Sequence, residues 1–163
     1  MKKYIVLVFL AISVIALFSN MTYEQQTIVP ELTTILENKP FEAQLSTLSF
    51  TYWGETISVE ERGYFNFVEF LIRKTSHFFG YGLAATLFYG LYRKLHLRFA
   101  VLLAIATIFV IACVDELRQS FVPGRTGIFN DVLIDTSGAI FVLTVLKIII
   151  ALYKLATKNR VRI

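Results

Sequence analysis

Nine polar residues lie near the ends of apolar segments, in three groups whose spacing is suited to chemistry. They are Lys74, His77 and Tyr81, then Asp115, Glu116 and Gln119, and finally Arg125, Asp131 and Asp135. Within the groups the spacings of three and four residues place side chains on one face of a helix. A histidine near carboxylates can transfer protons, and guanidinium or ammonium groups can hold an anion. These residue types predict acid–base chemistry or the binding of an anionic head group.

The side chains suggest a role for each member of this set. His77 is the candidate general acid or base, and Asp115 or Glu116 is its expected orienting or catalytic partner. A tight turn at Pro123-Gly124 is expected to bring Arg125 back toward these carboxylates. The candidate substrate-binding residues are Lys74, Tyr81, Gln119, Arg125, Asp131 and Asp135.

Two other interpretations of these residues stay open. The histidine and carboxylates could hold a divalent metal, although the sequence has no H-E-x-x-H motif, and we expect no metal or other cofactor. Alternatively, Lys74, Arg118 and Arg125 could neutralise the carboxylates in a structural polar cap with no site. Cys113 is the single cysteine, so the chain cannot form an internal disulfide.

Four apolar stretches must position these groups. They cover roughly residues 4–18, 76–92, 99–114 and 130–153, and each approaches or exceeds the about 17 residues that span a bilayer. We therefore predict an all-α polytopic membrane protein with four transmembrane helices. With 163 residues, 56% of them apolar, the chain has no room for a separate soluble enzyme domain. The predicted organisation is an N-terminal membrane anchor and extracytoplasmic segment (1–66), a membrane domain (67–155) and a basic cytoplasmic tail (156–163).

The charges predict an orientation, because all 12 acidic residues can be placed on one side of the membrane. The other side then receives Lys2, Lys3, Arg93, Lys94, Arg98, Lys147, Lys154, Lys158, Arg160 and Arg162. This positive-inside pattern predicts that both termini are cytoplasmic and that the candidate site faces outward. The net charge of +4 resides in these segments, so membrane lipid is an expected partner and nucleic acid is not. The first apolar stretch lacks a small-x-small cleavage pattern and is expected to stay as an anchor.

The extracytoplasmic segment between the first two apolar stretches predicts short elements. Residues 25–38 have apolar positions at helical spacing, with Pro30 suited to a first turn. Residues 45–52 and 57–59, separated by Gly54, indicate a possible β-hairpin. Ser58-x-x-Glu61 predicts a capped helix start near Val59, and this helix is expected to continue into the second transmembrane helix.

Three motifs together resemble those of a known family over roughly residues 70–146. The motifs are Lys74-x-x-His77-Phe78, Asp115-Glu116-x-x-Gln119-x-Phe121-x-Pro123-Gly124-Arg125-x-Gly127, and Asp131-x-x-x-Asp135-x-x-Gly138. They are similar to the signature of the VanZ-like membrane proteins, named for a member associated with resistance to the glycopeptide teicoplanin. The position of Asp135 is usually Asn in that family. The resemblance implies a role at the bacterial cell envelope, in the cytoplasmic membrane.

Two classes of function fit these expectations. The protein could bind a lipid-linked or cell-wall precursor without changing it, and so alter glycopeptide susceptibility. It could instead be an enzyme that acts on a lipid-linked envelope intermediate by histidine and carboxylate acid–base chemistry. A proton-coupled carrier is a third possibility, but the chain lacks the paired repeats typical of carriers.

Overall fold

The computed structural model describes residues 2–160, so the last three positions of the predicted basic tail, Arg162 among them, lie outside the described residues. The described chain is mostly helical. Its elements are α1 (Lys2–Asn20), α2 (Tyr23–Gln26), α3 (Val29–Ile35), α4 (Glu42–Leu45), β1 (Ser49–Tyr52), β2 (Glu55–Ser58), α5 (Val59–Arg62), α6 (Tyr64–Lys94), α7 (Ala100–Gln119) and α8 (Phe129–Arg160).

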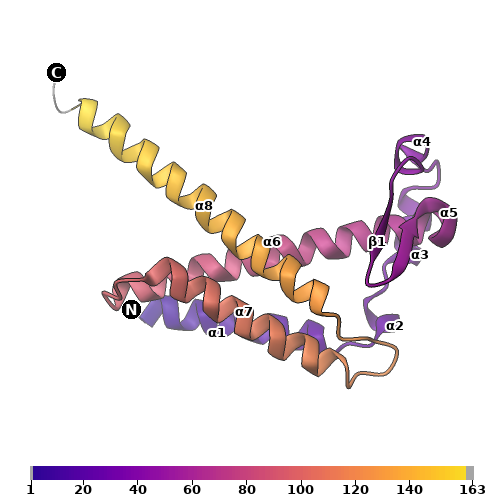
Figure 1. Ribbon diagram of the computed structural model, residues 1–163, viewed down its shortest axis with the longest axis horizontal. Helices are drawn as coiled ribbons and strands as arrows, with labels where there is room; N and C mark the ends of the chain where they lie inside the picture. The colour runs from indigo at the N-terminus through magenta and orange to yellow at the C-terminus, as the bar shows by residue number, and fades with distance from the viewer. Residues whose placement is uncertain (1, 161–163) are drawn as a thin grey trace.

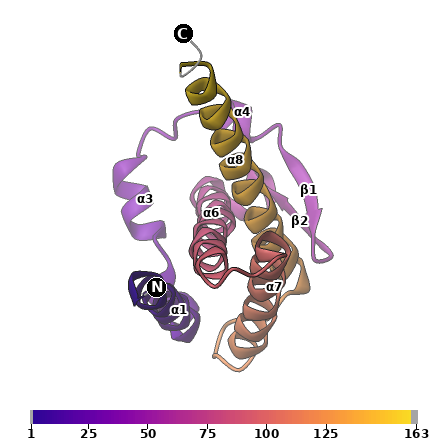
Figure 2. The ribbon, with the colours of Figure 1, turned by 90° about the vertical axis from the view of Figure 1, so that its left-hand side faces the viewer.

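Among the described residues, three helices combine the length and the apolar composition that a membrane span requires, namely α1, α7 and α8. Helix α6 is longer than α1 and α7, with 31 residues, but it carries Arg73, Lys74, His77 and several tyrosines and glycines. These residues lower its apolar character, and its assignment as a fourth span stays a prediction. Helix α6 occupies the centre of the bundle, with α1 on one side and α7 and α8 on the other (Figure 2).

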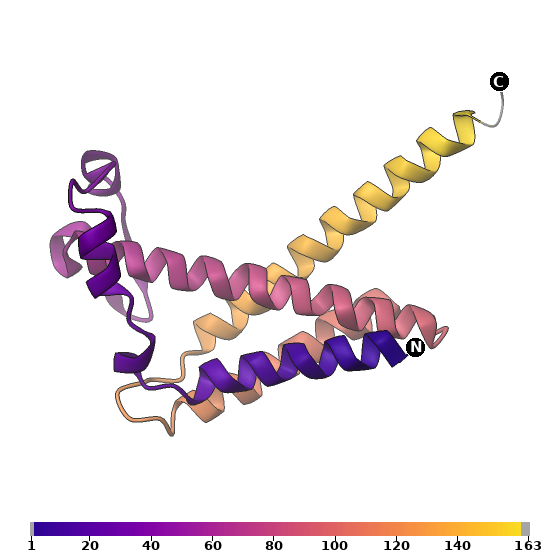
Figure 3. The same ribbon diagram turned by 180° about the vertical axis from the view of Figure 1, so that it is seen from behind.

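The helix ends are distributed between two ends of the molecule. The start of α1, the α6–α7 connection and the end of α8 lie toward one end, whereas the α1–α6 segment and the α7–α8 loop lie at the other (Figures 1 and 3). The last part of α8 extends beyond the bundle and exposes apolar side chains such as Ile148, Ile149 and Leu152. Exposed apolar surface on such helices is suited to contact with lipid.

The core lies where α6, α7 and α8 meet. Small residues allow their backbones to approach, because Ala104 and Ala112 on α7 and Ala139 on α8 are fully buried. The closest approach is between α6 and α8 at Gly138, where an added Cβ would lie 2.0 Å from the carbonyl oxygen of Phe78. Gly82 lies in the same crossing, with its Cβ position 2.9 Å from the Gly138 carbonyl oxygen. Glycine at position 138 therefore fixes the relative position of the two helices.

The outer segment differs from the predicted single helix over residues 25–38. The chain forms the short helices α2 and α3 instead, because the turn through Thr27 and Ile28 interrupts the helix. Thr22 and Gln25 cap α2 reciprocally, and Pro30 lies in the first turn of α3 as expected. The segment wraps around the N-terminal part of α6, with α3 on one side and the strands on the other (Figure 2).

The predicted hairpin is confirmed, although its first strand begins at Ser49 and not at residue 45. Strands β1 and β2 are antiparallel, and Trp53-Gly54 forms the connection with φ values of 52° and 82°. Two consecutive positive φ angles define the type I′ turn that suits a two-residue hairpin.

The predicted helix start near Val59 also occurs. The Ser58 hydroxyl accepts a hydrogen bond of 3.1 Å from the Glu61 N–H. The expected continuous helix is nevertheless wrong, because Gly63 adopts φ 74° and separates α5 from α6.

Candidate functional site

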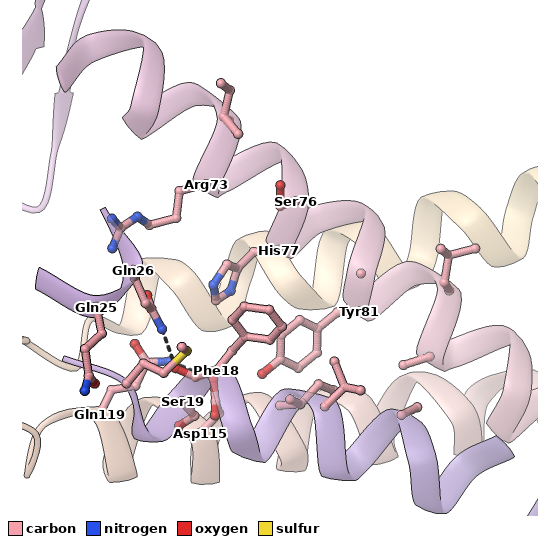
Figure 4. A pocket seen from close by; sticks show the side chains of 18 of the residues that line it. Phe18, Ser19, Gln25, Gln26, Arg73, Ser76, His77, Tyr81, Asp115 and Gln119 are labelled. Atoms are coloured by element: carbon pink, nitrogen blue, oxygen red, sulfur yellow. Dashed lines mark hydrogen bonds between the residues drawn. The ribbon is translucent and has the colours of Figure 1, made fainter. Parts of the chain in front are cut away.

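A cavity of about 900 Å³ lies between α1, α6 and α7, and part of its wall is the segment around α2 (Figure 4). Most of its length is apolar, with walls formed by Leu7, Leu10, Val14 and Phe18 of α1 and by Leu83 and Leu87 of α6. One end is polar and is lined by Glu69, Arg73, His77, Tyr81, Asp115, Gln119 and Arg125. The cavity therefore has the shape and chemistry of a site for an amphiphile.

Helix α1 forms one wall because it is attached near both of its ends. At the first end, the Tyr4 ring packs on Gly90, where an added Cβ would lie 2.2 Å from the ring. At the other end, Arg118 donates hydrogen bonds to Ser19 Oγ at 3.2 Å, to Asn20 Oδ1 at 2.8 Å and to the Ala16 carbonyl. Arg118 thus caps the last turn of α1, whereas the polar-cap interpretation had assigned it to the carboxylates.

His77 is placed beside Asp135, and not beside Asp115 or Glu116 as predicted. Its Nδ1 lies 3.3 Å from Asp135 Oδ1, and Asp135 is fully buried. The crossing at Gly138 explains this pairing, because Asp135 lies three residues before Gly138 on the same face of α8. The His77 ring also stacks on Tyr81, with ring centroids 5.9 Å apart.

Asp115, Gln119 and Arg125 form a chain of contacts, as the convergence of these groups predicted. Gln119 Nε2 donates to Asp115 Oδ2 at 2.7 Å, and Arg125 donates to Gln119 Oε1. Arg125 therefore reaches the amide, whereas direct contact with a carboxylate was expected. Burial lowers the pKa of Arg125, and the nearby Arg73 guanidinium lowers it further. The two guanidinium groups are thus close enough to repel each other.

Glu116 faces the α7–α8 loop. Its Oε2 accepts the Ile128 N–H at 2.8 Å, and Gly127 packs on its backbone, where an added Cβ would lie 2.2 Å from the Glu116 carbonyl oxygen. Glu116 is not among the residues that line the cavity. It positions the loop that carries Arg125.

Lys74 and Asp131 connect the hairpin to the bundle. The Asp131 carboxylate accepts hydrogen bonds from Lys74 Nζ and from the Tyr52 hydroxyl, and Lys74 Nζ lies 4.8 Å from the centroid of the Tyr52 ring. Burial and the hydrogen bond to Asp131 raise the pKa of Tyr52, so its hydroxyl stays protonated as a donor. Neither Lys74 nor Asp131 lines the cavity.

Sequence analysis missed a further cluster at the polar end of the cavity. Glu69 is only 4% exposed and accepts hydrogen bonds from the Ile28 N–H at 2.8 Å and the Tyr23 hydroxyl at 3.1 Å. Arg73 Nη2 lies 3.5 Å from Glu69 Oε1, and its guanidinium covers the Tyr23 ring. The spacing of four residues between Glu69, Arg73 and His77 was a signal for this cluster.

The polar end contains donors that the described chain does not satisfy. The buried atoms without a hydrogen-bond partner in this part of the chain are Arg73 Nη2, His77 Nδ1, Tyr81 OH, Glu116 Oε1, Arg125 Nη1 and both Asp135 oxygens. Those that belong to cavity-lining residues are all potential donors. Within the described residues, no group of three His, Cys, Asp or Glu side chains is arranged to hold a metal ion.

Apolar helices packed around a cavity with a polar end define a multi-pass membrane protein. The comparison with known families agrees with this class. The model of the VanZ/LLP1 family matches residues 4–151, and the chain belongs to this family. The match confirms the resemblance and extends it to α1 and the outer segment. The comparisons find no match among curated proteins or among solved structures.

Proposed function

We propose that this protein crosses the bacterial cytoplasmic membrane four times and binds an anionic amphiphile at its outer face. The ligand class is a lipid-linked or cell-wall precursor, and its binding affects the cell envelope and susceptibility to glycopeptides such as teicoplanin. The observation that carries the proposal is the cavity, which is apolar along α1 and α6 and donor-rich at one end.

The two ends of the cavity match the two parts of such a ligand. A hydrocarbon chain contributes free energy by contact with the apolar walls, at about 25 cal/mol per Å² of surface removed from water. Buried donors without acceptors are unfavourable, and phosphate oxygens would satisfy those of Arg73 and Arg125. Relief of the repulsion between these two guanidinium groups adds to the affinity for an anion.

Filling the cavity from Gly80 tests lipid binding directly. Gly80 lines the cavity, and no atom lies within 4 Å of its Cβ position, so a leucine side chain would occupy the space without a clash at Cβ. We expect Gly80→Leu to reduce co-purifying lipid at least about tenfold, while Leu is also a better helix former. Mass spectrometry of the purified protein measures the retained lipid. Undiminished retention by Gly80→Leu, with Gly80→Ala as the size control, would contradict the proposed cavity site.

The proposed orientation predicts which introduced cysteines react from outside the cell, after Cys113 is replaced by Ala. Cysteines at Lys39 and Gly124, in the outer segment and the α7–α8 loop, should react with a membrane-impermeant thiol reagent in intact cells. A cysteine at Lys94 should react only after lysis. Labelling at Lys94 but not at Lys39 would reverse the orientation and place the polar end of the cavity in the cytoplasm.

The pairing of His77 with Asp135 supports a second candidate function, namely acid–base catalysis on the bound intermediate. A histidine oriented by a buried carboxylate is the arrangement that general bases use. The two candidates differ in the fate of the ligand. An enzyme would convert the retained lipid to a product of different mass with time, and His77→Ala would abolish that conversion.

A further inference from the structure

We infer that the head group bound in the cavity is a phosphate monoester or a terminal diphosphate, and not a phosphodiester. The inference rests on the proposed lipid binding and concerns the charge that the site requires. Its basis is the pairing of His77 with Asp135.

Asp135 carries the first step of the argument because its side chain is fully buried and neither oxygen has a hydrogen-bond partner in the described chain. A buried carboxylate is costly unless an opposite charge lies beside it. Within the described residues, His77 is the only basic side chain within ion-pair distance of Asp135. Lys74, on the same helix as His77, is already paired with Asp131. A positively charged His77 would therefore balance Asp135.

The orientation of the His77 ring carries the second step. Nδ1 is buried and faces Asp135, while the side chain as a whole is 27% exposed and points into the cavity (Figure 4). An imidazolium donates from both ring nitrogens, so its other edge would offer a charged donor to a ligand. The contact between Gly138 and Phe78 holds the two helices, and hence this geometry, in place.

The number of charged donors carries the third step. Arg73, His77 and Arg125 all line the polar end. Glu69 neutralises Arg73 only in part, since it also accepts hydrogen bonds from Tyr23 and Ile28. Asp115, the other carboxylate here, accepts a hydrogen bond from Gln119. A phosphate monoester has about 1.5 to 2 negative charges and three free oxygens, whereas a phosphodiester has one charge and two free oxygens. Three charged donors therefore match the monoester.

Competition between two lipids with the same acyl chains tests the inference. The full-length protein is reconstituted in nanodiscs with equal amounts of dioleoyl phosphatidic acid and dioleoyl phosphatidylglycerol, then extracted, and the retained lipids are quantified by mass spectrometry. We expect the wild type to enrich the monoester about tenfold or more, as one additional charge-assisted hydrogen bond would give. Inorganic phosphate at the same concentration should not displace it, because the hydrocarbon contributes to binding.

Two variants assign the preference to the pair. His77→Gln and Asp135→Asn should each bring the lipid ratio close to one while total retained lipid stays within about twofold. Asp131→Asn, a matched change one turn earlier on α8, should keep the preference because Asp131 contacts Lys74 and Tyr52.

The outcomes separate this inference from the proposed function. Equal retention of both lipids by the wild type would overturn the inference and leave lipid binding in place. Persistence of the monoester preference in both His77→Gln and Asp135→Asn would also overturn it. Retention of neither lipid would overturn the proposed function itself. Displacement by inorganic phosphate would show that the site binds the free anion and not a lipid.

Discussion

Arg125→Gln is expected to reduce lipid retention by about 10- to 100-fold and to remove the glycopeptide phenotype that the wild type confers. Arg125 lies in the α7–α8 loop, lines the polar end of the cavity, and has a buried N–H without an acceptor in the described chain. Hydrogen bonds to charged groups contribute about 1.5–3 kcal/mol each, which corresponds to that range in affinity. Lipid exchange into the purified protein, followed by mass spectrometry, measures the change.

Two other substitutions make this result specific. Arg125→Lys keeps the charge but loses the planar fork that binds two oxygens at once, so we expect an intermediate loss. Arg62→Gln removes an arginine that pairs with Glu55 next to the hairpin and does not line the cavity, so retention should not change. If Arg125→Gln retained lipid as well as Arg62→Gln does, Arg125 would have only a structural role.

Gly138→Val should destabilise the protein more than any of the substitutions in the cavity. An added Cβ would lie 2.0 Å from the Phe78 carbonyl oxygen, and this backbone atom cannot rotate away as a side chain could. Helices α6 and α8 must therefore separate, at a cost of about 3 kcal/mol or more. The separation would also move Asp135 away from His77. Thermal unfolding in detergent should show a large decrease in the melting temperature.

Gly80→Ala is the matched control on α6, since no atom lies within 4 Å of the Cβ position of Gly80. Alanine within a helix is favoured over glycine by about 0.5–1 kcal/mol, so this variant should melt at the wild-type temperature or slightly above it. A Gly138→Val protein as stable as Gly80→Ala would show that the α6–α8 crossing is looser than the contact at Phe78 indicates.

Local patterns predicted the elements that depend on neighbouring residues. Gly54 and the flanking β-branched and aromatic residues predicted the hairpin, and Ser58 with Glu61 predicted the start of α5. The predicted helix over residues 25–38 was wrong because apolar spacing persists across Thr27 and Ile28, where the backbone turns. The break at Gly63 was equally hidden, because a glycine in a helical pattern indicates a positive φ only when the fold requires it.

The pairing of groups between helices could not be predicted from spacing. Spacing within one helix correctly grouped Lys74 with His77 and Asp115 with Gln119, but it says nothing about the rotation of α8 against α6. That rotation depends on the backbone contact at Gly138, and it places Asp135 beside His77. The family resemblance gave no reason to expect a charge at position 135, where the usual residue is Asn, because an amide there would not need a cationic partner.

The attachment of α1 through Arg118 has a consequence for biosynthesis. Asn20 and Arg118 are separated by 98 positions, so the ribosome completes most of the chain before this contact can form. The first helix therefore enters the bilayer without its outer attachment, and the wall that it contributes to the cavity is fixed only when α7 has been inserted. At that moment the helices are already surrounded by lipid. The assembling cavity thus closes around bilayer contents, and a bound lipid belongs to its history from the first.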